Sequence, residues 1–230
     1  FISLAVLVGV LLALALGRFS SLSGAWAAGV GLVLILVFGG YFLWFFRDPE
    51  RVPPKDPDAV LAAADGVVAK ITTFTVEEFG SISMLAGLKP EDMAVFRNGD
   101  VLRISIFLSL FDVHVNRTPI SGTSRFLGYF PGKHLFTFDE KSSDVNQHNS
   151  ILIVNERTSC LVNQIVGPVC RRVVYWLDHD APVAVAAGDD FGMMKFGSRL
   201  DMYFPAGDVE VLVSVGEKVR AGESIIGRYR

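Results

Sequence analysis

The chain has 230 residues and a formal net charge of −3, with no block of lysine or arginine, which argues against a nucleic-acid-binding protein. Its two cysteines stand apart without a CxxC pair, and only four histidines are present, which argues against a structural zinc site. The mean hydropathy of +0.43 is high for a soluble protein. The excess lies in residues 1–46, and the rest of the chain is long enough for an ordinary hydrophobic core.

Two apolar segments predict a pair of membrane-spanning helices over residues 1–46. Residues 1–16 are apolar except for Ser3, and residues 25–46 carry no charge; the latter run would be about 33 Å long as a helix, enough to cross a bilayer. The polar stretch GRFSSLSG joins the two segments, so we expect a helical hairpin. The alternative is a signal peptide cleaved at AWA, residues 25–27, but a second spanning run follows at once and no cationic segment precedes it.

Charged residues beside the second segment predict its orientation. Arg47, Arg51 and Lys55 follow it, whereas the linking loop carries Arg18 alone. Tyr41 and the aromatic residues after it resemble an interfacial belt. The positive-inside rule therefore places the large domain on the cytoplasmic face of the inner cell membrane.

The remainder of the chain predicts a linker and one mainly β domain. Residues 47–60 contain four prolines and alternating charges, which favours a stiff, extended linker. Residues 61–230 hold short apolar runs punctuated by Gly, Pro, Asn and Asp, a pattern typical of strands. A helical turn is expected only within TVEEFGSISML, residues 75–85. The expected strands include Val67–Ile71, Val101–Phe107, Ile151–Val154, Val173–Leu177, Val183–Ala186 and Val209–Val213.

The C-terminal sequence resembles the β-hairpins of lipoyl- and biotinyl-like domains. Their order of glycines, valines and turn residues occurs in PAGDVEVLVSVGEKVRAGESIIGRYR. The stretches DGVVAKI and DAPVAVAAGDDFG show a similar pattern. A hybrid-barrel fold is therefore expected for the β domain. A carrier function is not, because Lys218 does not sit at a tight hairpin tip as those domains require.

Several polar residues are candidates for a functional site, and each has a structural alternative. Asp65 follows an alanine run, so it is either a turn residue or a hydrogen-bonded, functional carboxylate. His114, Asn116 and Arg117 end an apolar run, where they either face a cleft or satisfy structural contacts. The remaining candidates are expected to be structural: His134 and His148 on the surface, His179 in a solvated turn, and Cys160 and Cys170 as reduced thiols rather than a disulfide.

The bond between Gly197 and Ser198 is either a simple turn or a site of self-cleavage. In self-cleavage the Ser198 hydroxyl attacks the Gly197 carbonyl, and the acyl group moves from nitrogen to oxygen. Glycine suits the preceding position because it tolerates strain and lets the nucleophile approach. A base must activate the hydroxyl and a donor must hold the oxyanion. Elimination and hydrolysis would then leave a pyruvoyl group on the new chain.

Five motifs in this order resemble the phosphatidylserine decarboxylases, in particular their short membrane-anchored form. They are FFRDPER, ADGVV, FLSLFDVHVNRTPISG, PGK and FGMMKFGSRLD, which together extend from about Phe45 to the C-terminus. The resemblance departs from the longer members at two points. Arg117 occupies the position of their second histidine, and FGSR replaces their LGST.

The resemblance implies a pyruvoyl enzyme whose site residues can be named. It implies self-cleavage between Gly197 and Ser198, with Ser198 as nucleophile and pyruvoyl precursor. It further implies that Asp65 orients and charges His114, the proton carrier, as a carboxylate does in a Ser-His-Asp arrangement. Arg117 and Asn116 are expected to bind the substrate, with a structural ion pair as the alternative for Arg117.

The expected reaction converts phosphatidylserine of the bilayer into phosphatidylethanolamine and CO₂, with the pyruvoyl ketone as electron acceptor. The large and small chains are expected to stay associated, and the resemblance also admits a homodimer. Two other functions remain as alternatives: a non-catalytic membrane-tethered adaptor with a hybrid-barrel domain, and a decarboxylase of another serine-headed lipid such as archaetidylserine.

Overall fold

The computed structural model describes residue 10 and residues 24–82, 85, 88–136, 145–167, 172–195 and 198–230. Contacts divide the chain into two compact units, Phe1–Asp48 and Pro49–Arg230. The boundary follows Asp48, so most of the segment expected as a linker belongs to the larger unit. Apart from Val10, the first expected membrane span lies outside the described residues.

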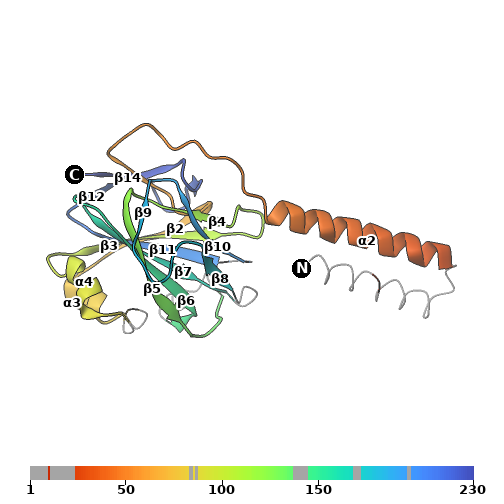
Figure 1. The fold of residues 1–230 in the computed structure, drawn as a ribbon, viewed down its shortest axis with the longest axis horizontal. Helices are drawn as coiled ribbons and strands as arrows, with labels where there is room; N and C mark the ends of the chain where they lie inside the picture. Colours follow the sequence, from red (N-terminus) through yellow and green to blue (C-terminus); the bar gives the residue numbers. More distant parts are fainter. Residues whose placement is uncertain are drawn as a thin grey trace. The chain divides into compact units, whose positions relative to one another are not determined.

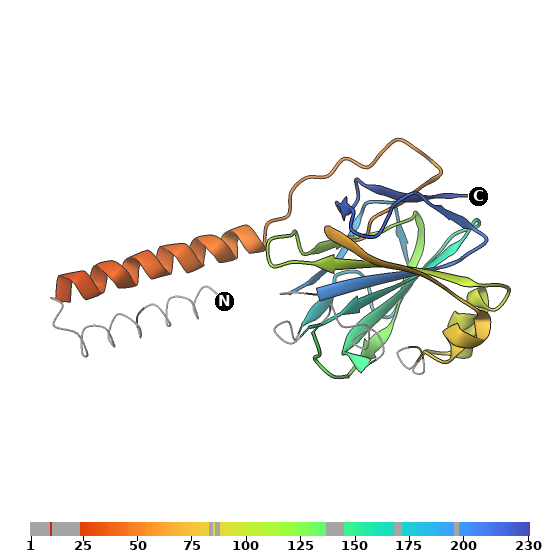
Figure 2. The ribbon, with the colours of Figure 1, turned by 180° about the vertical axis from the view of Figure 1, so that it is seen from behind.

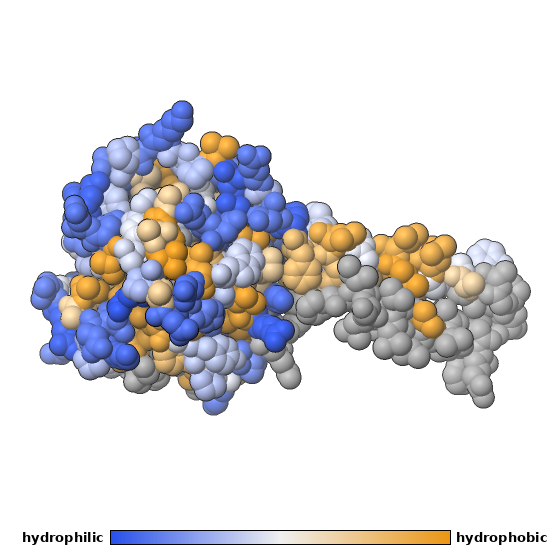
Figure 3. All heavy atoms as spheres, viewed as in Figure 1, coloured by the Kyte–Doolittle hydropathy of each residue, from blue (hydrophilic) through white to orange (hydrophobic). Residues whose placement is uncertain are grey.

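The smaller unit contains one long apolar helix, α2 (Gly24–Phe45). Within it, Ala28–Phe45 has a mean hydropathy of 2.1, and among the described residues this is the one helix long and apolar enough to cross a membrane. Large apolar side chains along the helix, including Leu36 and Leu43, are exposed, and hydrophobic residues gather along it in Figure 3. Arg47 lies over the Trp44 ring at 3.8 Å, beside the end of the helix. These features are consistent with a membrane anchor.

The larger unit is mainly β, as the sequence predicts. Its described residues include the short helical turns α3 (Val76–Gly80), α4 (Pro90–Met93) and the 3₁₀ turn η2 (Ala94–Phe96). The strands are β1 (Ala59–Leu61), β2 (Gly66–Phe74), β3 (Val101–Leu108), β4 (Val115–Arg117), β5 (Gly122–Phe130), β6 (His148–Val154), β7 (Ser159–Ile165), β8 (Val173–Tyr175), β9 (Val183–Val185), β10 (Asp190–Met194), β11 (Ser198–Pro205), β12 (Val209–Val211), β13 (Lys218–Val219) and β14 (Ile225–Tyr229).

These strands form three antiparallel sheets. The largest has the order β13-β2-β3-β11-β7-β6-β5-β9, and the smaller two are β1-β14-β12 and β4-β10-β8. Strands from all three sheets contribute to one main core, as Val60, Phe191 and Leu200 illustrate. Figures 1 and 2 show β12 and β14 beside the C-terminus, and α3 and α4 together at one edge of the unit.

Strand β11 lies between β3 and β7 and buries both of its faces. Leu200, Met202 and Phe204 point into the main core. Tyr203 belongs to a second apolar cluster with Phe79 of α3, so the helical turns cover this end of the opposite face. Successive side chains of a strand point to opposite faces, and both faces of β11 are covered. The polar residues of β11 are therefore buried as well.

The six expected strands and the expected helical turn are confirmed. Helix α3 begins with a capping box, in which the Thr75 side chain accepts from the Glu78 amide and the Glu78 carboxylate accepts from the Thr75 amide. The surface position expected for His148 is wrong. His148 belongs to β6, is 4% exposed and stacks on the Phe130 ring at 5.0 Å, because its strand is covered on both faces.

The other residues expected to be structural are placed as follows. His134 is partly buried, and His179 is exposed in a bend, as predicted. Cys160 is a free, fully buried thiol, and burial raises its pKa well above the ordinary value. Cys170 lies outside the described residues.

Candidate active site

Ser198 is the first residue of β11 and is fully buried. It pairs with Leu108, the last residue of β3. Among the described residues its hydroxyl oxygen has no hydrogen-bond partner. A buried hydroxyl without a partner costs free energy, which is compatible with the functional role expected for Ser198. Gly197, on the other side of the candidate scissile bond, lies outside the described residues.

Asp65 lies just before β2, two strands away from Ser198. Val67 pairs with Phe107, which brings Gly66 beside Leu108 and therefore near the strand end where Ser198 lies. Gly66 has a φ of +146°, and a Cβ atom there would approach the Phe107 carbonyl oxygen to 2.1 Å. Only glycine allows this approach. Neighbouring strands are about 4.8 Å apart, so the backbones at Asp65 and Ser198 are separated by roughly 10 Å.

The Asp65 carboxylate is held by two donors. Its Oδ1 accepts from the Ala221 amide at 2.8 Å, and its Oδ2 accepts from Arg51 at 2.9 Å. Burial raises the pKa of Asp65 above its ordinary value, although both donors lower it. The negative charge of Asp112 raises the pKa of Asp65 further, which shows that the 109–114 turn lies near Asp65.

His114 follows that turn and precedes β4. The turn closes through Asp112, whose Oδ2 accepts from the amide and hydroxyl of Ser109 at 2.7 Å each. His114 Nδ1 lies 2.9 Å from the Asp112 carbonyl oxygen. Because a carbonyl only accepts, Nδ1 must carry the proton, and Nε2 is then the basic nitrogen of the neutral ring. The His114 carbonyl accepts from the Met194 amide at 3.0 Å, four residues before Ser198.

The structure therefore brings the strand ends that carry Ser198, Asp65 and His114 to one region of the larger unit. The described contacts of Asp65 are with Arg51 and Ala221, and the described hydrogen bond of His114 is with Asp112. A carboxylate–imidazole pair between Asp65 and His114 stays a prediction.

A buried chain of side-chain amides completes the region, and the sequence analysis found only one of its members. Gln164 Nε2 donates to Asn116 Oδ1 at 2.7 Å, and Asn149 Nδ2 donates to Gln164 Oε1 at 3.2 Å. Gln164 pairs with Leu200, so it faces the same side of the sheet as Ser198. Within the described chain, Asn116 Nδ2 has no hydrogen-bond partner. The signal that was missed is the glutamine, Gln164, inside the apolar run CLVNQIV.

Arg117 has structural contacts on several sides. Its guanidinium lies 2.9 Å from an Asp190 carboxylate oxygen and donates to the carbonyls of Gly188 at 3.1 Å and Pro49 at 3.3 Å. These contacts support the structural alternative for this residue. Substrate binding by Arg117 stays a prediction.

A buried ion pair lies directly after Ser198. Arg199 Nε donates to Asp201 Oδ1 at 2.7 Å, and Arg199 Nη2 donates to the hydroxyl of Ser105 at 2.8 Å. Both charged side chains are at most 4% exposed, and they point away from the face that carries Ser198. Removing one partner would leave a buried charge, so the pair holds β11 in its register against β3.

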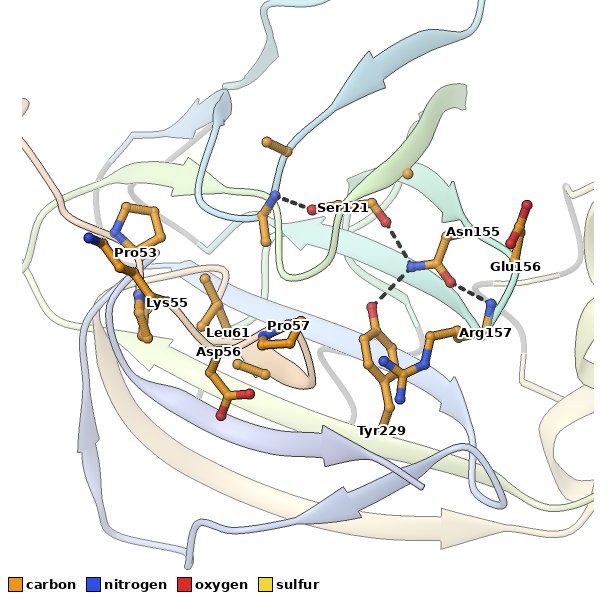
Figure 4. A pocket seen from close by; sticks show the side chains of 15 residues that line it. Pro53, Lys55, Asp56, Pro57, Leu61, Ser121, Asn155, Glu156, Arg157 and Tyr229 are labelled. Carbon is orange, nitrogen blue, oxygen red and sulfur yellow. Dashed lines mark hydrogen bonds between the residues drawn. The ribbon is translucent and has the colours of Figure 1, made fainter.

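The pocket of about 690 Å³ in Figure 4 is a different place in the larger unit. It is lined by the proline-rich segment and by Tyr229, and it contains none of the candidate catalytic residues. Asn155 spans its wall, with Nδ2 donating to the Ser121 carbonyl at 2.8 Å and to the Tyr229 hydroxyl at 3.0 Å. Arg157 lies over the Tyr229 ring at 4.0 Å. These groups already have partners, so the pocket offers no evident chemistry.

A buried serine at a strand start, a buried histidine and a carboxylate at nearby strand ends define a class: enzymes that use a nucleophile and an acid–base group. The family model described as phosphatidylserine decarboxylase matches residues 38–227. The chain belongs to the phosphatidylserine decarboxylase family.

Individual relatives cover most of the chain. The phosphatidylserine decarboxylase proenzyme of Chlorobium phaeobacteroides is 41% identical over 203 residues, which cover 88% of this chain and 84% of the relative. The proenzyme of Gluconacetobacter diazotrophicus is 38% identical over 193 residues, 84% of this chain and 78% of the relative. The proenzyme of Carboxydothermus hydrogenoformans is 36% identical over 216 residues, which cover 94% of this chain and 92% of the relative. The resemblance drawn from the motifs is confirmed.

Proposed function

We propose that this chain is the precursor of a phosphatidylserine decarboxylase that cuts itself between Gly197 and Ser198. The observation that carries the proposal is the fully buried Ser198 hydroxyl, without a hydrogen-bond partner among the described residues, in a chain of this family. The relatives are named proenzymes, which supports a precursor that matures by cleavage. The same family membership argues against a non-catalytic adaptor.

Self-cleavage uses the chain's own groups. His114 Nε2 accepts the proton of the Ser198 hydroxyl, whose oxygen attacks the Gly197 carbonyl carbon, and the C–N bond breaks to leave an ester and a free amine. Loss of the Cα proton of residue 198 then breaks the Cβ–Oγ bond and releases Gly197 as a carboxylate. Water hydrolyses the remaining dehydroalanine and releases ammonia, which leaves a pyruvoyl group at the start of the small chain.

The buried position at residue 198 fits such a group, because amide donors lie on the same side of the sheet. When present, the pyruvoyl ketone takes up the electron pair released as a serine headgroup loses CO₂. Asn116 Nδ2 is a donor available to the substrate oxygens, and His114 Nε2 delivers the proton to the headgroup carbon. Asp65 contributes a negative charge that orients and stabilises the protonated His114 ring.

The proposal also includes the arrangement of the chain at the membrane. We assign α2 and the apolar segment before it to a helical hairpin in the inner membrane, with the larger unit, a hybrid barrel, on the cytoplasmic face. The apolar surface of α2 and the positive residues after it support this assignment. A tether in the bilayer raises the effective concentration of a lipid substrate at the site. A homodimer stays a prediction.

The small chain is expected to remain bound after cleavage. Residues 198–230 supply β11, which pairs with both β3 and β7, and β13 and β14, which pair with β2 and β1. Cleavage removes one covalent bond and none of these pairings. In detergent without denaturant, both fragments should elute together on size exclusion and separate only when denaturant is added. Release of the small fragment without denaturant would contradict this arrangement.

The substrate is tested with purified, cleaved protein in mixed micelles. We expect CO₂ release and conversion of phosphatidylserine to phosphatidylethanolamine, measured by mass spectrometry of the lipids. Archaetidylserine has the same headgroup, so a parallel assay tests whether the protein acts on ether lipids instead. Cleaved protein that decarboxylates neither lipid would refute the proposed function.

A further inference from the structure

Arg51 links the segment after the membrane helix to the candidate active site. Its Nη2 donates to Asp65 Oδ2 and its Nη1 donates to Glu223 Oε2, both at 2.9 Å. The Arg51 side chain is only 8% exposed. A guanidinium holds two carboxylates with a fixed geometry that a single ammonium group does not reproduce.

The contacts of Asp65 fix the direction of its carboxylate. Arg51 holds one oxygen, and the Ala221 amide holds the other at 2.8 Å. Ala221 and Glu223 follow Ser198 in the sequence, whereas Arg51 and Asp65 precede it. After cleavage, the Asp65 carboxylate would therefore be held by one group from each chain.

The segment that carries Arg51 has further anchors on the larger unit. The Pro49 carbonyl accepts from Arg117 at 3.3 Å, and the Val52 amide donates to Glu223. The hydrogen bond from Arg51 lowers the pKa of Glu223, so this carboxylate remains charged beside the guanidinium. These contacts seat residues 49–52 next to Asp65.

The charges around Asp65 give Arg51 a specific electrostatic effect. Burial raises the pKa of Asp65, and the nearby Asp112 carboxylate raises it further. The Ala221 amide and the Arg51 guanidinium lower it. The carboxylate of Glu223 binds Nη1 of the guanidinium, and that of Asp65 binds Nη2. Among these side chains Arg51 is the cation in direct contact with Asp65, so its removal favours the protonated acid.

We propose that Arg51 is a positioning residue that orients the Asp65 carboxylate and keeps it ionised, so that the site is competent only when the segment after the membrane helix is seated. This inference rests on the proposed function, in which Asp65 acts on His114. It assigns a role in the chemistry to the second arginine of the FFRDPER motif.

The test follows self-cleavage of labelled chains made by cell-free synthesis into lipid nanodiscs, across a range of pH. At neutral pH, Arg51→Gln should slow cleavage by up to about 100-fold, because the carboxylate is misplaced and its pKa rises. The difference in cleavage rate between this variant and the wild type should shrink as the pH rises and Asp65 ionises again. The acid limb of the variant's rate profile therefore moves to higher pH. A purely structural role of Arg51 would give the same deficit at every pH.

Two other variants refine the test, and a third serves as the matched control. Arg51→Lys keeps the charge but cannot reproduce the fixed geometry of the guanidinium at Asp65, so it should keep the wild-type acid limb and lower the maximal rate. Glu223→Gln leaves the contact between Arg51 and Asp65 and should change the rate by no more than a few fold. Arg157→Gln removes an equivalent arginine that pairs with Asp58 at 2.6 Å on the surface, and should leave the profile unchanged.

The outcomes separate this inference from the proposed function. Wild-type chain that remains uncut contradicts self-cleavage itself. Wild-type chain that is cut, together with a pH-independent deficit or no deficit in Arg51→Gln, overturns only the role of Arg51. If Arg51→Gln does not fold, as judged by thermal unfolding, Arg51→Lys decides alone, and a wild-type maximal rate in that variant overturns the inference.

Discussion

Ser198→Ala should leave the protein as a single 25.1 kDa chain and abolish CO₂ release. The wild type should instead give fragments of roughly 21 and 4 kDa, in proportion to their lengths, with the small fragment blocked at its amino end. Without the hydroxyl there is no nucleophile for the attack on Gly197, and without cleavage there is no ketone to accept electrons. Denaturing gels and intact mass spectrometry measure both outcomes.

The chain provides its own control for this substitution. Ser81 follows the other glycine-serine pair in the sequence, and its hydroxyl donates to the Glu78 carbonyl at the exposed end of α3. Ser81→Ala should therefore be cut and active like the wild type. An Ser198→Ala chain that still produces phosphatidylethanolamine would show that the mechanism is wrong.

His114→Gln should slow self-cleavage by about 100- to 10,000-fold, the usual contribution of a positioned acid–base group. Glutamine has similar bulk and can still donate a hydrogen bond to the Asp112 carbonyl, but it cannot take a proton from Ser198. The half-time of cleavage after synthesis measures the effect.

His179→Gln is the comparison for the histidine substitution. His179 is exposed in a bend and contacts the Phe126 ring at a centroid distance of 4.4 Å, away from the described contacts of His114. We expect its cleavage rate to stay within about two-fold of wild type, as for other surface substitutions. Equal rates for His114→Gln and wild type would remove His114 from the proposed chemistry.

Two of the strands that the sequence did not predict, β7 and β11, share one physical cause. They carry Asn163, Arg199 and Asp201, residues that normally lie at the surface. Here they are buried because the large sheet is covered on both faces, and side chains from neighbouring strands satisfy them. The Ser150 hydroxyl, for example, donates to Asn163 at 2.8 Å. A pattern of apolar and polar residues in one strand cannot show that such a partner is present.

The same limit applies to the candidate site. Ser198, His114 and Asp65 are named by short local motifs, so the sequence is enough to propose them. The groups that hold Asp65 come from Arg51, 14 residues before it, and Ala221, 156 residues after it. Only the folded chain brings them together. The error at His148 has a similar origin, because NQHNS has the composition of a loop and yet leads into a buried strand.

The central position of β11 makes maturation a one-way event. A precursor can unfold and refold as one molecule, at a rate independent of its concentration. If the bond before Ser198 breaks as proposed, recovery from full denaturation requires two separate polypeptides to meet. The shorter polypeptide must then insert between β3 and β7 of the longer one. The lifetime of the working enzyme is then set by how slowly it unfolds rather than by an equilibrium.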